Sequence, residues 1–101
     1  MKFRQPLSQH SKTMLGTLGV FIEQTDLEFN MGRHETCFIG MLHRMLGADT
    51  IRPNALWFAE TVGMNFHDAS DMCIDVAWTP QRKLGEITRE EATRFLWEIS
   101  Q

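Results

Sequence analysis

The feature that most constrains this chain is the segment from Thr36 to Gly47, Thr-Cys-Phe-Ile-Gly-Met-Leu-His-Arg-Met-Leu-Gly. In a helix with about 3.6 residues per turn, its apolar side chains point in nearly every direction. Only one narrow stripe, which includes Gly40 and His43, is small or polar. A helix that is apolar nearly all round is usually buried by its neighbours. We therefore predict a central helix over about residues 36–46, ended by the glycine at 47.

Four more helices are predicted by apolar residues that recur at helical spacing on both sides of this segment. The predicted ranges are about 8–24, 53–62, 66–76 and 88–99. Three of them begin at a serine, asparagine or threonine cap, and Pro53 is placed in the first turn of the other. A short strand over 73–78 is an alternative, because apolar and polar residues partly alternate there.

The predicted fold class is therefore all-α. We expect a compact single domain over residues 1–101, with about five helices packed around the central apolar helix at about 36–46. Residues 1–7 precede the first predicted cap and are expected to form a flexible N-terminus.

Two glycines interrupt the first predicted helix. Gly16 and Gly19 lie on one side of it, and each glycine costs about 1 kcal/mol relative to alanine inside a helix. Close approach of a neighbouring backbone would explain why they are there. That neighbour is either another helix of this chain or a second copy, so a structural homodimer is one alternative for this protein.

Composition narrows the function classes. The chain has 101 residues, a formal charge of −3 at pH 7 and 43% hydrophobic residues, which is enough to fill one core. Because it carries no excess of Lys and Arg, direct binding of nucleic acid is not expected. No apolar run approaches the length of a membrane span, and the first residues lack the apolar part of a secretory signal. We expect a cytoplasmic protein that does not bind membranes.

Three groups of residues follow one another in a distinctive order. They are Cys37-Phe38-Ile39-Gly40, then Ala59-Glu60-Thr61-Val62-Gly63-Met64 with Ala69 and Met72, and finally Ile87-Thr88 with Ala92 and Leu96. Over about residues 20–99 this order resembles a loose group of uncharacterised small bacterial and phage-encoded helical proteins with a Cys-x-x-Gly central helix. The chain departs from that group at Ile39, Met41 and Leu42. The resemblance implies a helical fold, a mobile-element origin and, for a phage-encoded protein, residence in the host cytoplasm; it carries no activity across.

Cys37 is the main candidate for chemistry, because the start of a helix favours a thiolate. A thiol enzyme would also need a histidine base, and the candidates are His34, His43 and His67, with Asp68 to complete the group. The apolar surroundings of the cysteine favour a packing role instead, since free cysteine is among the most buried residue types. A thiol-dependent enzyme is therefore kept as the second hypothesis.

The two cysteines, Cys37 and Cys73, both fall in apolar helical patterns. Reduced core thiols are therefore expected more than a disulfide. Among His and Cys residues, His34 and Cys37 at three apart come closest to the spacing of two zinc ligands. No second pair completes four ligands, so neither a metal site nor a cofactor is expected.

Tryptophans on the polar sides of helices are candidates for partner recognition, because tryptophan is enriched at binding hot spots. Trp57 and Trp97 meet this description, and Arg94 lies beside Trp97 on the last predicted helix. One side of the helix at 66–76 carries an acidic ridge that could face a basic partner. It consists of Asp68, Asp71 and Asp75.

Our leading hypothesis is that the protein binds another protein and does not catalyse a reaction. Its likeliest contact residues are the two tryptophans, Arg94 and the acidic ridge. With the resemblance added, the specific version is a phage or mobile-element accessory factor, such as an anti-defence (anti-CRISPR-like) inhibitor of a host complex. The identity of its protein partner does not follow from the sequence.

Overall fold

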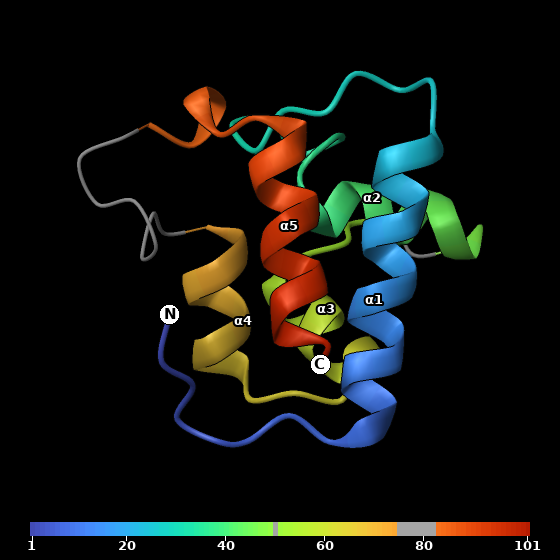
Figure 1. Ribbon diagram of the computed structural model, residues 1–101. Coiled ribbons are helices and arrows are strands. Elements are labelled where there is room, and N and C mark those ends of the chain that lie inside the picture. Colours follow the sequence, from blue (N-terminus) through green and yellow to red (C-terminus); the bar gives the residue numbers. More distant parts are fainter. Residues whose placement is uncertain (50, 75–82) are drawn as a thin grey trace.

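The computed structural model describes residues 1–49, 51–74 and 83–101 (Figure 1). Within these ranges it contains five α-helices, one short 3-10 helix and no strand, so the predicted all-α fold class is confirmed. The helices are α1 (Gln9–Gln24), α2 (Phe38–Leu46), α3 (Ala55–Val62), α4 (Phe66–Cys73) and α5 (Arg89–Ile99), and the 3-10 helix is Leu84–Glu86. Most of the segment considered as an alternative strand lies outside the described residues. None of the helices described is both long and apolar enough to cross a membrane.

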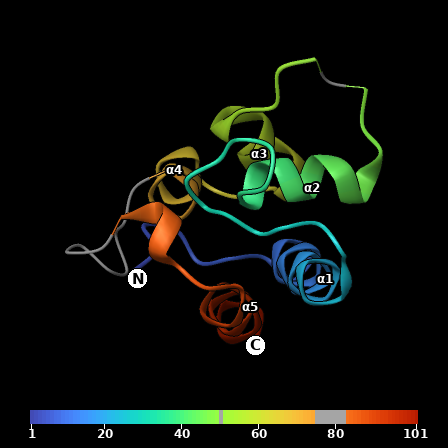
Figure 2. The same ribbon diagram turned by 90° about the horizontal axis from the view of Figure 1, so that it is seen from above.

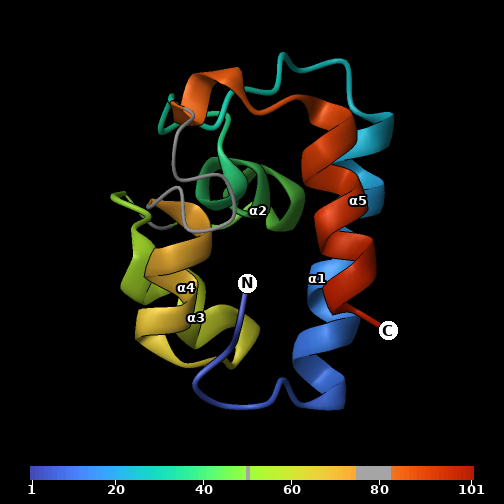
Figure 3. The same ribbon diagram turned by 60° about the vertical axis from the view of Figure 1, so that its left-hand side comes forward.

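The helices form two layers. Helices α1 and α5 lie side by side in one layer, while α2, α3 and α4 form the other, as the view from above shows (Figure 2). The N-terminal segment passes along one edge of the molecule from the α4 side to the start of α1 (Figure 3). The molecule measures 35 × 30 × 23 Å, with a radius of gyration of 12.2 Å. The core lies between the layers, and no segment that the structure describes crosses the outer face of the α1–α5 layer (Figure 2).

The contact between α1 and α5 explains both glycines of α1. A Cβ atom at Gly19 would lie 3.3 Å from Cβ of Leu96, and one at Gly16 would lie 3.3 Å from Oγ of Ser100. The neighbour that approaches them is therefore α5 of the same chain. The contact with α5 thus accounts for these glycines without a second copy of the chain, and the structural homodimer stays a hypothesis.

Helix α2 begins two residues later than predicted. Its N-cap is Cys37, which makes no side-chain capping bond, and its C-cap Gly47 adopts the left-handed conformation with φ 60°. The first five residues of the helix, from Phe38 to Leu42, are all buried. Beyond them the helix emerges from the core, and Leu46 is 45% exposed. The central position of α2 thus holds for its N-terminal half.

The other helix starts are set mainly by side-chain caps. Ser8, Asn65 and Thr88 act as predicted, and Thr88 forms a full capping box with Glu91. The start of α3 differs from prediction, because its N-cap is Asn54, whose side chain accepts from the amide of residue 57. Pro53 therefore lies just outside the helix rather than in its first turn.

The N-terminal segment is attached to the fold. The backbone N–H groups of Arg4 and Gln5 both donate to the carboxylate of Asp68 on α4. Phe3 and Leu7, on either side of them, are partly buried against the core. Residues 1–7 were expected to form a flexible N-terminus, and no sequence pattern indicated these contacts because their partner lies more than sixty residues away.

Candidate functional site

The outer face of the α1–α5 layer carries the most exposed tryptophan among the described residues. Trp97 on α5 is 63% exposed, and Val20 on the neighbouring α1 is 51% exposed. Together with Gly16, Gly19, Glu23 and Thr93 they line a small hollow of about 40 Å³ between the helices. A wider hollow of about 300 Å³ continues from it along α5, and Glu23, Thr93 and Trp97 line both. We call the residues Val20, Glu23, Thr93, Arg94 and Trp97 the Trp97 face.

The position of Trp97 follows from the helical period of α5. Leu96 is fully buried against α1, and the next residue along a helix points about 100° away from it. The indole therefore projects to the rim of the helix pair. From α1, the small hollow beside the ring is lined by Gly16, Gly19, Val20 and Glu23. The indole lies at its rim and stays mostly exposed.

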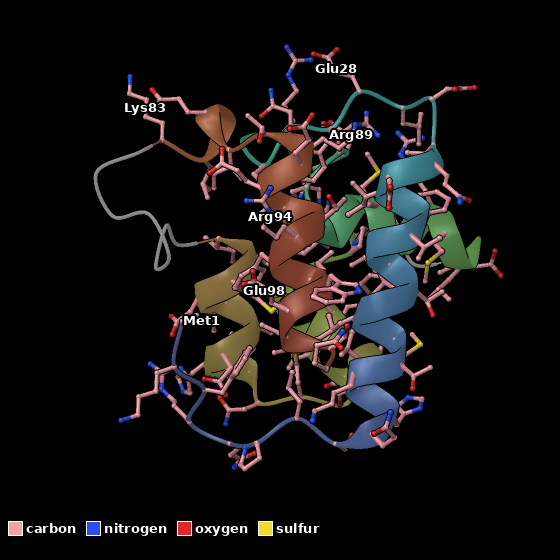
Figure 4. The ribbon with its side chains drawn as sticks, viewed as in Figure 1. Met1, Glu28, Lys83, Arg89, Arg94 and Glu98 are labelled. Carbon is pink, nitrogen blue, oxygen red and sulfur yellow. The ribbon has the colours of Figure 1, made fainter. Side chains whose placement is uncertain are left out.

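Charged groups surround this apolar centre. Glu23 reaches the wider hollow from α1, and Glu90 and Arg94 reach it from α5. Arg94 is exposed and lies about midway along α5 (Figure 4). An apolar anchor within a charged rim is the usual composition of a protein-binding surface.

Arg89 also lines the wider hollow, but its guanidinium forms hydrogen bonds within the chain. It donates to the carbonyl oxygens of Ile22, Thr25 and Leu27, at the end of α1 and just beyond it. Figure 4 shows it at the start of α5, near the last turn of α1. Arg89 therefore joins the two helices that carry the Trp97 face and is not available to a partner.

Trp57 lies elsewhere. It is partly buried against the core on α3, in the other layer of the molecule. Its ring meets that of His43 edge-on, with 5.7 Å between the ring centroids. The two tryptophans predicted as contact residues therefore lie in different layers. The sequence period placed both on polar sides of helices but could not show to which layer each side belongs.

Of the predicted acidic ridge, the two members that the structure describes are both in contact with the N-terminal segment. Asp68 is only 1% exposed and is enclosed by the N-terminal segment. Asp71 pairs with the guanidinium of Arg4 at 2.7 Å. Asp75 lies outside the described residues. The helical period did place Asp68 and Asp71 near each other, but the segment that covers them could not be read from that period.

Cys37 is buried, at 4% exposure, and its thiol makes one described hydrogen bond, to the carbonyl oxygen of His34 at 3.5 Å. Two of the three imidazoles considered as its base contact aromatic rings: His43 meets the ring of Trp57, and the ring of His67 meets that of Phe66 at 5.5 Å. His34, the third, lines the same hollow as Cys37, and the hydrogen bond described between these two residues runs from the thiol to the backbone of His34.

Cys73, at 2% exposure, lines the same cavity of about 220 Å³ as Cys37, and both thiols are free. Burial raises the pKa of the Cys73 thiol well above its usual value, and the nearby Cys37 raises it further. A protonated thiol is a poor nucleophile. Within the described ranges, no group of three or more His, Cys, Asp or Glu side chains is placed to hold a metal ion.

Three members of the Trp97 face were not identified from the sequence. They are Val20, Glu23 and Thr93. A signal for one of them was present, because Val20 is an apolar residue four positions after Gly16, on the glycine side of the helix. Comparison of the chain with protein-family models, with curated proteins and with solved structures gave no match.

Proposed function

We propose that this protein is a non-catalytic binding factor and that it contacts a protein partner through the Trp97 face. The observation that carries the proposal is the exposure of Trp97, at 63%, beside the exposed Val20. Leaving an indole in water sacrifices apolar burial that the core could have used. A partner that covers the ring would recover this free energy.

The surroundings of Trp97 support the same proposal. Hot spots are typically aromatic or arginine residues enclosed by a rim that excludes water, and Arg94, Glu23 and Glu90 supply such a rim here. The helices beneath are held rigidly by the close contact at Gly19 and by Arg89. A rigid surface loses little conformational entropy when it binds.

The resemblance to phage-encoded proteins supports a narrower version of this proposal. In it, the chain is an accessory factor of a phage or other mobile element that blocks or redirects a host complex, as an anti-defence inhibitor does. The narrower version requires the captured partner to be a host protein, whereas the general one does not.

The proposal is tested by using the full chain as bait in a lysate of its native host. Trp97→Ala should reduce retention of the specifically bound protein at least tenfold, since hot-spot truncations cost about 2 kcal/mol or more. The matched control is Leu56→Ala, which removes a 51% exposed apolar side chain from α3 in the other layer.

Circular dichroism should show the same helicity for both variants. Equal retention by Trp97→Ala and the unsubstituted chain would reject the Trp97 face. Loss of retention only in Leu56→Ala would assign binding to the other layer.

A further inference from the structure

The N-terminal segment is held by hydrogen bonds to one buried side chain, Asp68, and by two partly buried apolar residues. Residues 1–7 run past α4 toward the start of α1 (Figure 1, Figure 3). Phe3 and Leu7 rest on the core, and Arg4 and Gln5 between them face Asp68. The segment belongs to no helix, so its attachment depends on these contacts.

Asp68 receives four hydrogen bonds from this segment. The N–H of Arg4 donates to both carboxylate oxygens at 3.0 Å, and its Nη1 donates to Oδ1 at 3.1 Å. The N–H of Gln5 donates to Oδ2 at 3.3 Å. All the described side-chain hydrogen bonds of Asp68 therefore come from residues 4 and 5.

The helix that carries Asp68 does not depend on these bonds. The backbone N–H of Asp68 is capped by the side chain of Asn65 at 3.1 Å. Ala69 and Met72, on the same helix, are fully buried in the core. Helix α4 therefore keeps its own cap and its own packing if the segment leaves.

Few other charged groups face the carboxylate. Arg4 is the cation beside it, and its guanidinium is shared with Asp71, whose side chain is 28% exposed. Lys2 lines the same outer hollow as Arg4 and Asp71. A negative charge at Asp68 is thus required by the donors that surround it, and no second acceptor is described that could replace it for the two backbone N–H groups.

We propose that residues 1–7 form a releasable strap latched by Asp68, which detaches when this carboxylate loses its charge while the five helices stay folded. Release uncovers the apolar surface beneath Phe3 and Leu7. The strap and Asp68 are separate from the Trp97 face, which lies on α1 and α5.

The direction of the pH response follows from the latch. Burial by itself raises the pKa of the Asp68 carboxyl, but the hydrogen bonds from Arg4 and Gln5 outweigh this, and the pKa lies below its ordinary value. In the released state the carboxyl returns to its ordinary pKa. The latch therefore holds at neutral pH and weakens as the pH falls through the folded-state pKa.

The test is hydrogen exchange of the Gln5 amide, measured by NMR on the full chain at neutral pH. Asp68→Asn removes the charge and one acceptor at nearly constant volume, and it should speed this exchange at least tenfold. Amides within α1, α3 and α5 should stay within twofold of the unsubstituted chain. Asp71→Asn is the matched control, because it leaves both backbone bonds in place, and it should change Gln5 exchange less than threefold.

A second variant acts from the strap and leaves α4 untouched. Arg4→Pro removes the N–H that bonds both oxygens and also the guanidinium, and it should release the strap as Asp68→Asn does. Unchanged Gln5 exchange in Arg4→Pro would overturn the proposal. An equal rise of helical and Gln5 exchange in Arg4→Pro would also overturn it, because the strap would then be part of the cooperative core. If helical exchange rises in Asp68→Asn but not in Arg4→Pro, the Asn substitution has disturbed α4 itself, and the Gln5 exchange rate in Arg4→Pro then tests the proposal.

Discussion

At the scale of single residues, Gly40 is the position that tolerates change least. A Cβ atom there would lie 2.3 Å from the carbonyl carbon and oxygen of Glu35 and 2.4 Å from the carbonyl oxygen of His34. These are backbone atoms and cannot rotate away. We expect Gly40→Ala to lower the free energy of unfolding by about 2 to 3 kcal/mol, the upper part of the range for overpacked sites, as measured by urea denaturation.

Gly47 is the matched control for this prediction. Gly47 is the C-cap of α2, and nothing lies within 4 Å of a Cβ atom there. The strain of Gly47→Ala therefore comes only from its φ of 60°. That strain is worth about 1 kcal/mol. Gly40→Ala should therefore lower the free energy of unfolding more than Gly47→Ala does. An equal or smaller decrease would show that the backbone at His34 and Glu35 does not pack against Gly40.

The sequence predicted part of this residue-level picture. It placed Gly40 on the small stripe of the central helix and Trp97 on a polar side. It misplaced Asp68, for which the same helical argument predicted exposure. The difference is physical, since a helical period shows which residues share a face but not which distant segment covers that face.

At the scale of secondary structure, Arg89 links the start of α5 to the end of α1. Its guanidinium donates to carbonyl groups that a helix C-terminus leaves without partners. Its positive charge also stabilises the negative end of the α1 dipole. We expect Arg89→Ala to cost about 2 kcal/mol in urea unfolding, in the range of hydrogen bonds to a charged group. Arg89→Lys should recover only part of this, because lysine lacks the planar fork.

Arg94→Ala on the same helix serves as the comparison, and it should change the free energy of unfolding by no more than about 0.5 kcal/mol. If Arg89→Ala falls within that range as well, the guanidinium does not stabilise the end of α1.

Most helix starts were predictable because their caps lie within a few residues of the helix. Arg89 was not, because its acceptors lie 62 to 67 residues away.

At the scale of the whole molecule, the two thiols lie in the interior while the exposed tryptophan lies on the surface. We expect both Cys37 and Cys73 to react with iodoacetamide at least a hundredfold more slowly in the native protein than in urea, because alkylation requires an exposed thiolate. Peptide mapping by mass spectrometry distinguishes the two sites. Rapid native labelling of Cys37 alone would instead support the thiol-enzyme hypothesis.

The sequence predicted the number and approximate extents of the helices because each carries its own apolar period. It did not predict the two layers, since amphipathicity shows that a face is buried without naming its neighbour. Core residues outside the helices, such as Met31 and Ile87, were likewise missed because a loop has no period. The same limit concealed the strap and most of the Trp97 face.

If the chain works through the outer face of α1 and α5, as we propose, position 97 lies against the bound partner. The most direct measurement places a photo-crosslinking amino acid at position 97 and, in a second protein, at position 56, and irradiates both in native host lysate. We expect a specific covalent adduct with the captured partner from position 97 and none from position 56. An adduct from position 56 with none from position 97 would contradict the proposal.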